Sequence, residues 1–305
     1  MKVITHLQSE LENDMLSKVQ HQNFEPGEFV DICYKNYHEI ISLIEDFPWN
    51  KERSRIIIAL TNPSITIEDE KGNYLKLALF FNGKYVLHYF DKEQHLYTKS
   101  FTDYRGAYPY IQSFLEEGKL DLKDFKKEYT WNQHNLIHFA TKDFHYFLTK
   151  GKVRKFMWRQ NFASLLCTSI IAFIVILAIH RLQYATAFFL IIVSSPFWVF
   201  NLLLSSNYYN YAKRKMLYMT KGENVFYYGD KSAPTKYNKE DILKVVEHAV
   251  RGRSVANGFS FLKIHFENGE TIKIPNILVN NSELRNKLYM CNIILSGRPY
   301  MKKEA

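Results

Sequence analysis

The sequence predicts an α+β protein whose chain is interrupted by a hairpin of two transmembrane helices. Segments in which apolar and polar residues alternate predict strands, and segments with apolar residues every three or four positions predict helices. Two uncharged runs, residues 162–179 and 184–204, each approach the length that spans the hydrocarbon core of a bilayer. With 305 residues, the chain is long enough for two folded domains.

The charge of the chain is distributed unevenly. Residues 1–135 contain 16 Lys and Arg against 21 Asp and Glu, a net charge of −5, whereas residues 136–305 contain 24 against 10, a net charge of +14. An acidic half and a basic half favour different partners. The three cysteines are far apart in the sequence, so no disulfide framework is expected.

The acidic half predicts a cytoplasmic α+β domain over residues 1–135. Asn82-Gly83 lies between two strand-like segments and predicts a tight hairpin turn. Asp103 is a predicted helix cap and Gly118 the stop of the same helix. The expected helices are residues 4–19, 29–47 and 103–117, and the expected strands are residues 64–68, 74–81, 84–90 and 95–101.

Basic residues on both sides of the two uncharged runs predict the orientation of the hairpin. The short loop between the runs contains a single Lys or Arg residue, Arg181, so the positive-inside rule places both large flanks in the cytoplasm. The expected location is therefore the bacterial inner membrane, as a multi-pass protein with both termini cytoplasmic. The basic residues are interpreted as topogenic charges, as contacts to anionic lipid headgroups, or as both; they are Lys152, Arg154, Lys155, Arg159, Lys213, Arg214 and Lys215.

The composition of the two runs favours an anchor over a transporter. Ser164, Thr168 and Ala172 recur every four residues, and such a stripe of small side chains predicts close packing against a second helix. Neither run contains Asp, Glu or Lys, which a transport path usually requires.

The region after the hairpin predicts a small antiparallel sheet and a closing helix that can be capped by Ser282. The expected strands are residues 143–149, 215–220, 224–228, 242–250, 259–267 and 270–275, with Asn268-Gly269 as a second hairpin turn. These elements are the content of a pleckstrin-homology-like (PH-like) domain. The predicted organisation is a strand and basic lead over residues 136–161, the hairpin over 162–204 and the basic PH-like domain over 205–300.

Two family resemblances follow from this order of elements. The segment Phe144-His-Tyr-Phe-Leu-Thr, the basic lead, the hairpin, the strands with Ile272-Lys-Ile-Pro275 and the final helix resemble the YcxB-like bacterial membrane family. That resemblance implies a cytoplasmic PH-like domain split by a membrane hairpin and implies no chemistry. The first half, with the strand Gly83-Lys-Tyr-Val-Leu-His-Tyr and residues 101–122, weakly resembles the immunity domains of polymorphic-toxin systems. The resemblance to immunity domains assigns no role to any residue.

No catalytic motif is present, so the chain is expected to be non-enzymatic, without cofactor or metal. Glu116 and Glu117 end a predicted helix, where negative charge is unfavourable, which indicates a contact with a partner; a solvated helix end is the alternative. Arg251 and Arg253 are further candidates for a partner or headgroup contact.

The expected function is presentation of protein-binding modules at the inner leaflet by a non-enzymatic integral membrane protein. Two alternatives stay open: an immunity protein that neutralises a cognate bacterial toxin, and a module that senses anionic lipid. Nucleic acid is not an expected partner, because the basic excess clusters beside the two uncharged runs. Membrane lipids and a protein, which could be a toxin, are the expected partners.

Overall fold

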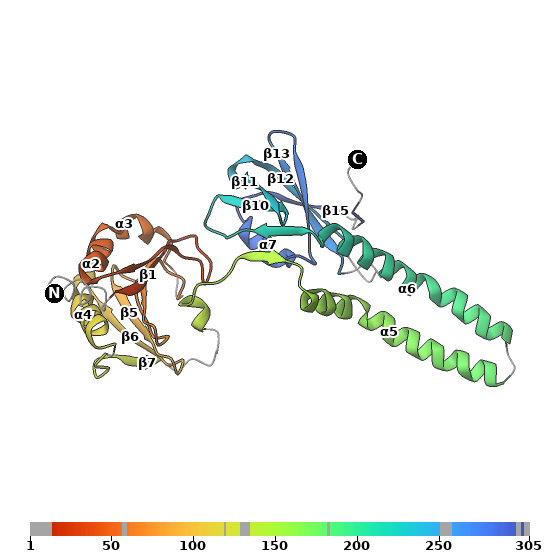
Figure 1. Cartoon of the computed structure of the whole chain (residues 1–305), viewed down its shortest axis with the longest axis horizontal. Helices are drawn as coiled ribbons and strands as arrows, with labels where there is room; N and C mark the ends of the chain where they lie inside the picture. The colour runs from red at the N-terminus through yellow and green to blue at the C-terminus, as the bar shows by residue number, and fades with distance from the viewer. Residues whose placement is uncertain are drawn as a thin grey trace, which may run out of the picture. The chain divides into compact units, whose positions relative to one another are not determined.

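A computed structural model of the chain describes residues 14–56, 60–118, 120–128, 135–181, 184–250, 258–296 and 300–301. The chain divides into two compact units (Figure 1). Unit 1 consists of Met1–Asp143 with Thr220–Gly222, and unit 2 consists of Phe144–Met219 with Glu223–Ala305.

Unit 1 is built on a seven-stranded antiparallel sheet with the strand order β2-β1-β3-β4-β5-β6-β7. Two α-helices, α2 and α4, supply much of the apolar core on one face of this sheet. The strands are β1 (Met15–Gln20), β2 (Val30–Lys35), β3 (Ser64–Glu68), β4 (Tyr74–Leu79), β5 (Tyr85–Phe90), β6 (Leu96–Phe101) and β7 (Lys126–Glu128). The helices are α2 (Tyr37–Asp46), α3 (Trp49–Glu52), η1 (Arg53–Arg55), η2 (Tyr104–Ala107), α4 (Tyr108–Glu117) and η3 (Asn135–His138).

The core of unit 1 follows from the two-residue period of β4. Leu75, Leu77 and Leu79 point to the helix-covered face, where they pack in the same cluster as Ile44 of α2 and Phe114 of α4. The alternate residues of β4 are buried as well, so the opposite face of the sheet is also covered.

Local turn and cap chemistry places several elements of unit 1 where the sequence predicts them. Asn82 and Gly83 both adopt positive φ, at 52° and 75°, as the tight turn between β4 and β5 requires. Asp103 accepts a hydrogen bond from Arg105 N at 3.0 Å, and Gly118 ends α4 in the left-handed conformation. The strands predicted at residues 64–68, 74–81, 84–90 and 95–101 and the helix predicted at 103–117 are thereby confirmed.

Of the two helices predicted near the N-terminus, the first is wrong in the part that the structure describes, and the second is confirmed only from Tyr37 onward. Met15–Gln20 is a strand, β1, that pairs with β3, and residues 4–13 lie outside the described residues. In residues 29–47, Val30–Lys35 forms strand β2, and the helix begins only after Asn36, which caps α2 in a capping box with Glu39. Pairing with a distant strand overrides the helical spacing of these short apolar segments.

Unit 2 contains two four-stranded sheets, with strand orders β11-β10-β9-β8 and β14-β13-β12-β15. Two long helices, α5 (Lys150–His180) and α6 (Tyr184–Ala212), are inserted between the first two strands and run side by side (Figure 1). The other elements are β8 (His145–Phe147), β9 (Lys215–Tyr218), β10 (Val225–Asp230), β11 (Ala233–Asn238), η4 (Lys239–Asp241), β12 (Ile242–Ala249), β13 (Ser260–Phe266), β14 (Thr271–Pro275), α7 (Asn281–Lys287) and β15 (Ile293–Ser296).

The two sheets of unit 2 and α7 enclose one apolar core. Leu217 of β9, Phe226 of β10 and Ile264 of β13 are fully buried in it, with Leu284 of α7 against them. A second cluster joins the sheet-proximal ends of the two long helices to β13 through Phe156, Tyr208 and Phe261. All six predicted strands of this region are present, whereas β11 and β15 were not predicted.

The prediction of a transmembrane hairpin over residues 162–204 is wrong, because none of the helices formed by the described residues is both long and apolar enough to cross a membrane. The first uncharged run has 18 residues, fewer than the roughly 20 apolar residues of a typical spanning helix, and the basic start of α5 precedes it. The second run is interrupted by Ser194, Ser195, Pro196 and Asn201. The predicted inner-membrane localisation depended on this hairpin and is corrected with it.

Truncation of a core side chain of α4 tests the packing in unit 1. Phe114 is fully buried, so Phe114→Ala should lower the free energy of unfolding by about 3–5 kcal/mol. Urea titration with hydrogen-exchange mass spectrometry of peptides from residues 74–117 reports this unit separately. Gln112 is exposed on the same helix, so the control Gln112→Ala should change the free energy of unfolding by less than about 0.5 kcal/mol. Equal stability of the two variants would contradict the assignment of Phe114 to the core.

Candidate functional site

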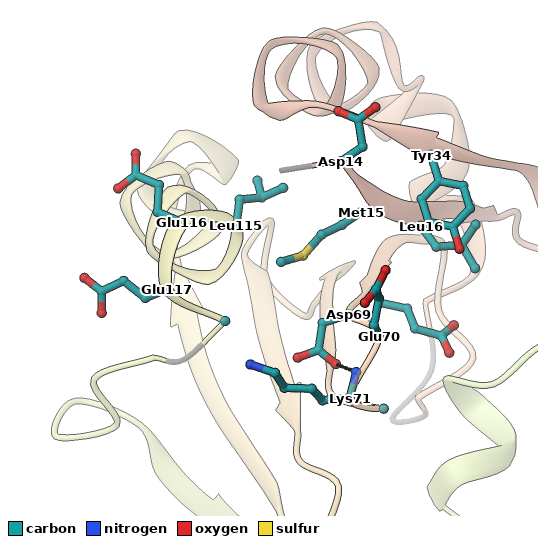
Figure 2. Close-up of a pocket in the computed structure, with 13 residues that line it drawn as sticks. Asp14, Met15, Leu16, Tyr34, Asp69, Glu70, Lys71, Leu115, Glu116 and Glu117 are labelled. Carbon is teal, nitrogen blue, oxygen red and sulfur yellow. Dashed lines mark hydrogen bonds between the residues drawn. The ribbon is translucent and has the colours of Figure 1, made fainter. Parts of the chain in front are cut away.

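An acidic cavity of about 480 Å³ lies in unit 1 where the start of β1, the β3–β4 turn and the end of α4 meet (Figure 2). Its wall contains six carboxylates and, among the described residues, a single basic side chain, Lys71. The lining residues are Asp14, Met15, Leu16, Tyr34, Glu68, Asp69, Glu70, Lys71, Gly72, Leu115, Glu116, Glu117 and Gly118.

The β3–β4 turn gives its three acidic residues different roles. Asp69 is buried, and its carboxylate accepts hydrogen bonds from Lys71 N at 2.9 Å and from Asn73 N at 2.8 Å. Glu68 forms an ion pair with Lys18, with 2.6 Å between Oε2 and Nζ. Glu70 is exposed and takes part in neither arrangement, so its charge is available at the cavity.

The end of α4 forms the opposite wall. Figure 2 shows the Leu115 side chain turned toward Met15, while the carboxylates of Glu116 and Glu117 project from the outer side of the helix. Glu116 accepts a hydrogen bond from Gln112 Nε2 at 2.8 Å. The two glutamates predicted to contact a partner therefore form part of the cavity's rim, with their charges directed toward solvent.

The arrangement provides a concave, negatively charged surface with an apolar floor from Met15, Leu16 and Leu115. Such a surface attracts a cationic side chain and accommodates its aliphatic stem. The sequence singled out Glu116 and Glu117 but gave no indication that they meet residues 68–70. Asp14 and Tyr34 were missed altogether, because they come from segments in which helices were predicted.

A basic cluster forms in unit 2 around the half-exposed ring of Phe147 in β8. The Nζ atoms of Lys152 and Lys231 lie 5.8 Å and 5.4 Å from the centroid of this ring. Both distances fall within the range of cation–π contacts. Lys231 was not predicted, because the turn after β10 that contributes it is distant in sequence from the other basic residues.

Two predicted residues join the same cluster from the start of β9. Lys231 N donates to Arg214 O at 2.8 Å, and the Nζ atom of Lys215 lies 5.3 Å from the ring centroid of Tyr211. Hydrogen bonds from Ser232, followed by the charges of Arg214 and Lys215, hold the pKa of Asp230 below its usual range. This cluster therefore consists of Lys152, Arg214, Lys215 and Lys231 with Phe147.

The other predicted site residues belong to neither the acidic cavity nor the basic cluster. Arg154, Lys155, Arg159 and Lys213 are exposed at the sheet-proximal ends of α5 and α6. Ala172 is exposed within α5, and the side chains of Ser164 and Thr168 lie outside the described part, so the packing stripe stays a prediction. Arg251 and Arg253 also lie outside the described residues.

Large apolar side chains are exposed along α5 and α6. Phe173, Ile176 and Phe188 have exposed fractions of 63%, 64% and 66%. An exposed apolar surface of this kind marks an interaction surface.

One group of side chains has the donor types of a metal site. Asp91, Glu93 and His95, in the turn between β5 and β6, place one ligand atom each within 4.8 Å of one another. The turn also explains this proximity without an ion, because Asp91 accepts hydrogen bonds from His95 N at 2.8 Å and lies 3.1 Å from its Nδ1.

Comparison with known families identifies part of unit 2. The PH domain family matches residues 145–287. This stretch contains both sheets except β15, the inserted helices and α7, so the chain contains a PH-like region. No curated protein and no solved structure matches the chain. The match gives no support to the narrower resemblances to YcxB-like proteins or immunity domains.

The contrast between Asp69 and Glu70 provides a test of the acidic turn. Asp69→Ala leaves the N–H groups of Lys71 and Asn73 without their acceptor and should lower the free energy of unfolding by about 1–3 kcal/mol. Glu70→Ala is the matched control and should change it by less than about 0.5 kcal/mol. Urea unfolding with hydrogen exchange over residues 64–79 measures both. A larger loss of unfolding free energy in Glu70→Ala than in Asp69→Ala would contradict the assigned roles.

Proposed function

We propose that the chain is a non-enzymatic binding protein whose unit 1 receives a basic segment of a protein partner in the acidic cavity. The observation that carries this proposal is the meeting of two acidic segments, residues 68–70 and 116–117, at one concave surface. Asp14 adds a third source of negative charge.

The size and the composition of the cavity support a peptide-like ligand. A volume of about 480 Å³ is in the range of pockets that enclose small ligands or single large side chains. Glu70 and Glu117 are exposed, and Glu117 ends α4, where the helix dipole already concentrates negative potential. A Lys or Arg side chain bound at the rim of the cavity, beside Glu117, would relieve this unfavourable charge.

A toxin is a specific form of such a partner. The resemblance of the first half to immunity domains suggests that the partner is a basic toxin, which the acidic unit neutralises by binding. The gene neighbourhood separates this version from a general adaptor, because a cognate toxin would be encoded next to the chain. Rescue of growth against that toxin by the wild-type protein, and loss of rescue in a cavity variant, would establish it.

Recognition of an anionic headgroup by unit 2 is a second candidate function. PH domains commonly bind lipids or proteins, and the basic cluster contains four cations, of which Lys152 and Lys231 lie beside the exposed ring of Phe147. Clustered basic residues bind surfaces of anionic lipid, with each contributing about 1 kcal/mol. The proposal needs only peripheral association.

Charge reversal at the cavity tests the protein-binding proposal. Affinity capture of the full chain from cells of its own source, with quantitative mass spectrometry, should recover a partner that carries a basic segment. Glu70→Lys with Glu117→Lys should reduce its recovery at least about tenfold, since two attractive charges become repulsive.

The matched control for this experiment is Asp46→Lys, which reverses an exposed acidic residue at the end of another helix, α2. Recovery should be unchanged in this control. Equal loss in the control and the cavity variant, or retention of the partner by the cavity variant, would refute the cavity as the binding site.

Vesicle flotation tests the second candidate. The full chain should float with phosphatidylcholine vesicles that contain phosphatidylglycerol and should bind less to phosphatidylcholine alone. Lys152→Ala with Lys231→Ala should weaken the charge-dependent part about 30-fold, because two contributions of about 1 kcal/mol each are lost. Lys236→Ala, which removes an exposed cation of β11 outside the cluster, is the control. Charge-dependent flotation that survives the double substitution would contradict the assignment.

A further inference from the structure

A row of polar side chains crosses the second face of the unit 1 sheet. The strand registers place Lys18 of β1 opposite Thr66 of β3, Thr66 opposite Lys76 of β4, and Lys76 opposite His88 of β5. Lys18, Thr66 and Lys76 are fully buried, and 8% of His88 is exposed. Burying two lysines in one row of a sheet, with only Thr66 between them, is costly unless their ammonium groups are hydrogen-bonded.

Lys76 is held by three oxygen acceptors. Its Nζ donates to Gln20 Oε1 at 2.8 Å, to Leu60 O at 2.7 Å and to His138 O at 3.0 Å. Among the described residues, no carboxylate lies within ion-pairing distance of it. Burial, with the nearby charge of Lys18, lowers its pKa to about 7.

Residues 136–142, here called the cover, close this row from solvent. The ring of Phe139 is fully buried and stacks on Phe90 with 4.9 Å between the centroids. Lys142 N donates to Gly27 O at 2.9 Å, and His138 O accepts from Lys76. The cover is therefore held by the stacked ring of Phe139 and by hydrogen bonds at His138 and Lys142.

Two histidines meet at the boundary between the row and the cover. The Nδ1 atoms of His88 and His138 are buried, and neither has a hydrogen-bond partner among the described residues. Burial, followed by the charge of Lys76, lowers the pKa of His138 to about 4. Burial, followed by the charges of Lys76 and His138, lowers the pKa of His88 to about 3.

The other titratable groups around these histidines come from β1, β3, β4 and the loop before β2. On β1, Lys18 is a cation, and its partner Glu68 of β3 is engaged with it at 2.6 Å. Burial and Glu68 raise the pKa of Tyr74 in β4 to about 12, so this phenol stays neutral. The loop that also covers this face contributes Glu25 and Glu28; the Glu28 carboxylate accepts from Glu25 N, Lys221 N and Gly222 N.

We propose that the cover is an acid-released latch, which leaves the polar row when His138 becomes protonated. Imidazolium at His138 would place a further positive charge beside Lys76, and none of the carboxylates among the described residues lies within ion-pairing distance of that lysine. Release of the cover exposes His138 to solvent and removes the unfavourable contact. It also uncovers the aromatic surface of Phe90 and Tyr74.

The direction of the pH effect follows from the lowered pKa values. A histidine whose pKa is lower in the closed state than in the open state stabilises the closed state above pH 6.5, its ordinary value. That stabilisation is lost as the pH falls from 6.5 through about 4. Between pH 7.5 and pH 5.0 the linkage of His138 alone should increase opening on the order of 30-fold.

Hydrogen-exchange mass spectrometry of the full chain at pH 7.5 and pH 5.0, corrected for intrinsic exchange rates, tests the latch. The amides of Phe139, Ala140 and Lys142 are hydrogen-bonded and therefore report on the cover. Their protection should fall on the order of 30-fold at pH 5.0 by the linkage above, while the amides of β4 and β5 keep theirs. Equal loss of protection in the cover and in these strands would show unfolding of the whole unit and would overturn the proposal.

His138→Gln keeps a polar side chain at the cover but cannot titrate, so most of the pH dependence should disappear. Because His138 is only half-buried, this variant is expected to fold, and it tests the proposal without disturbing His88. His95→Gln, a half-exposed histidine in the turn between β5 and β6, is the matched control and should behave as wild type. Undiminished acid opening in His138→Gln would also overturn the proposal.

Discussion

Burial of both faces of the seven-stranded sheet is the constraint on which unit 1 depends. One face packs leucines of β4 against α2 and α4, which is an ordinary apolar interface. The other face contains the polar row and must satisfy each ammonium group with oxygen acceptors from several segments. Leu60 and the cover are therefore required by the ammonium group of Lys76 beneath them, and sequence changes in these segments act directly on the sheet.

The opposite charges of the two halves are concentrated at particular surfaces instead of being spread evenly. The negative charge of unit 1 gathers at the cavity beside α4, and the positive charge of unit 2 gathers around Phe147. Each surface combines charge with apolar contact area, from Met15 and Leu115 in one case and from an aromatic ring in the other. This combination favours ligands that have both a charge and an apolar part over simple ions.

Local chemistry could be predicted from the sequence, whereas long-range pairing could not. The turn at Asn82-Gly83 and the end of α4 at Gly118 follow from the conformations that those residues adopt. Strand β1 was mistaken for a helix because its partner, β3, lies far along the chain. Strand β4 was predicted, but the burial of all six of its residues was not, because the segments that cover Lys76 are distant in sequence. Glu116 and Glu117 could be recognised because an acidic helix end is a local signal. Their meeting with residues 68–70 could not, because it depends on the tertiary fold.

The insertion of α5 and α6 between adjacent strands has a consequence for folding. Strands β8 and β9 pair directly although roughly 70 residues separate them, and closing so long a flexible loop would cost several kcal/mol of chain entropy. An antiparallel helical pair removes much of this cost, because it brings its own two ends together before the strands meet. The pairing of β8 with β9 depends only on the positions of those two ends, near Lys150 and Ala212. The length of the helical pair can therefore vary independently of the register of the sheet.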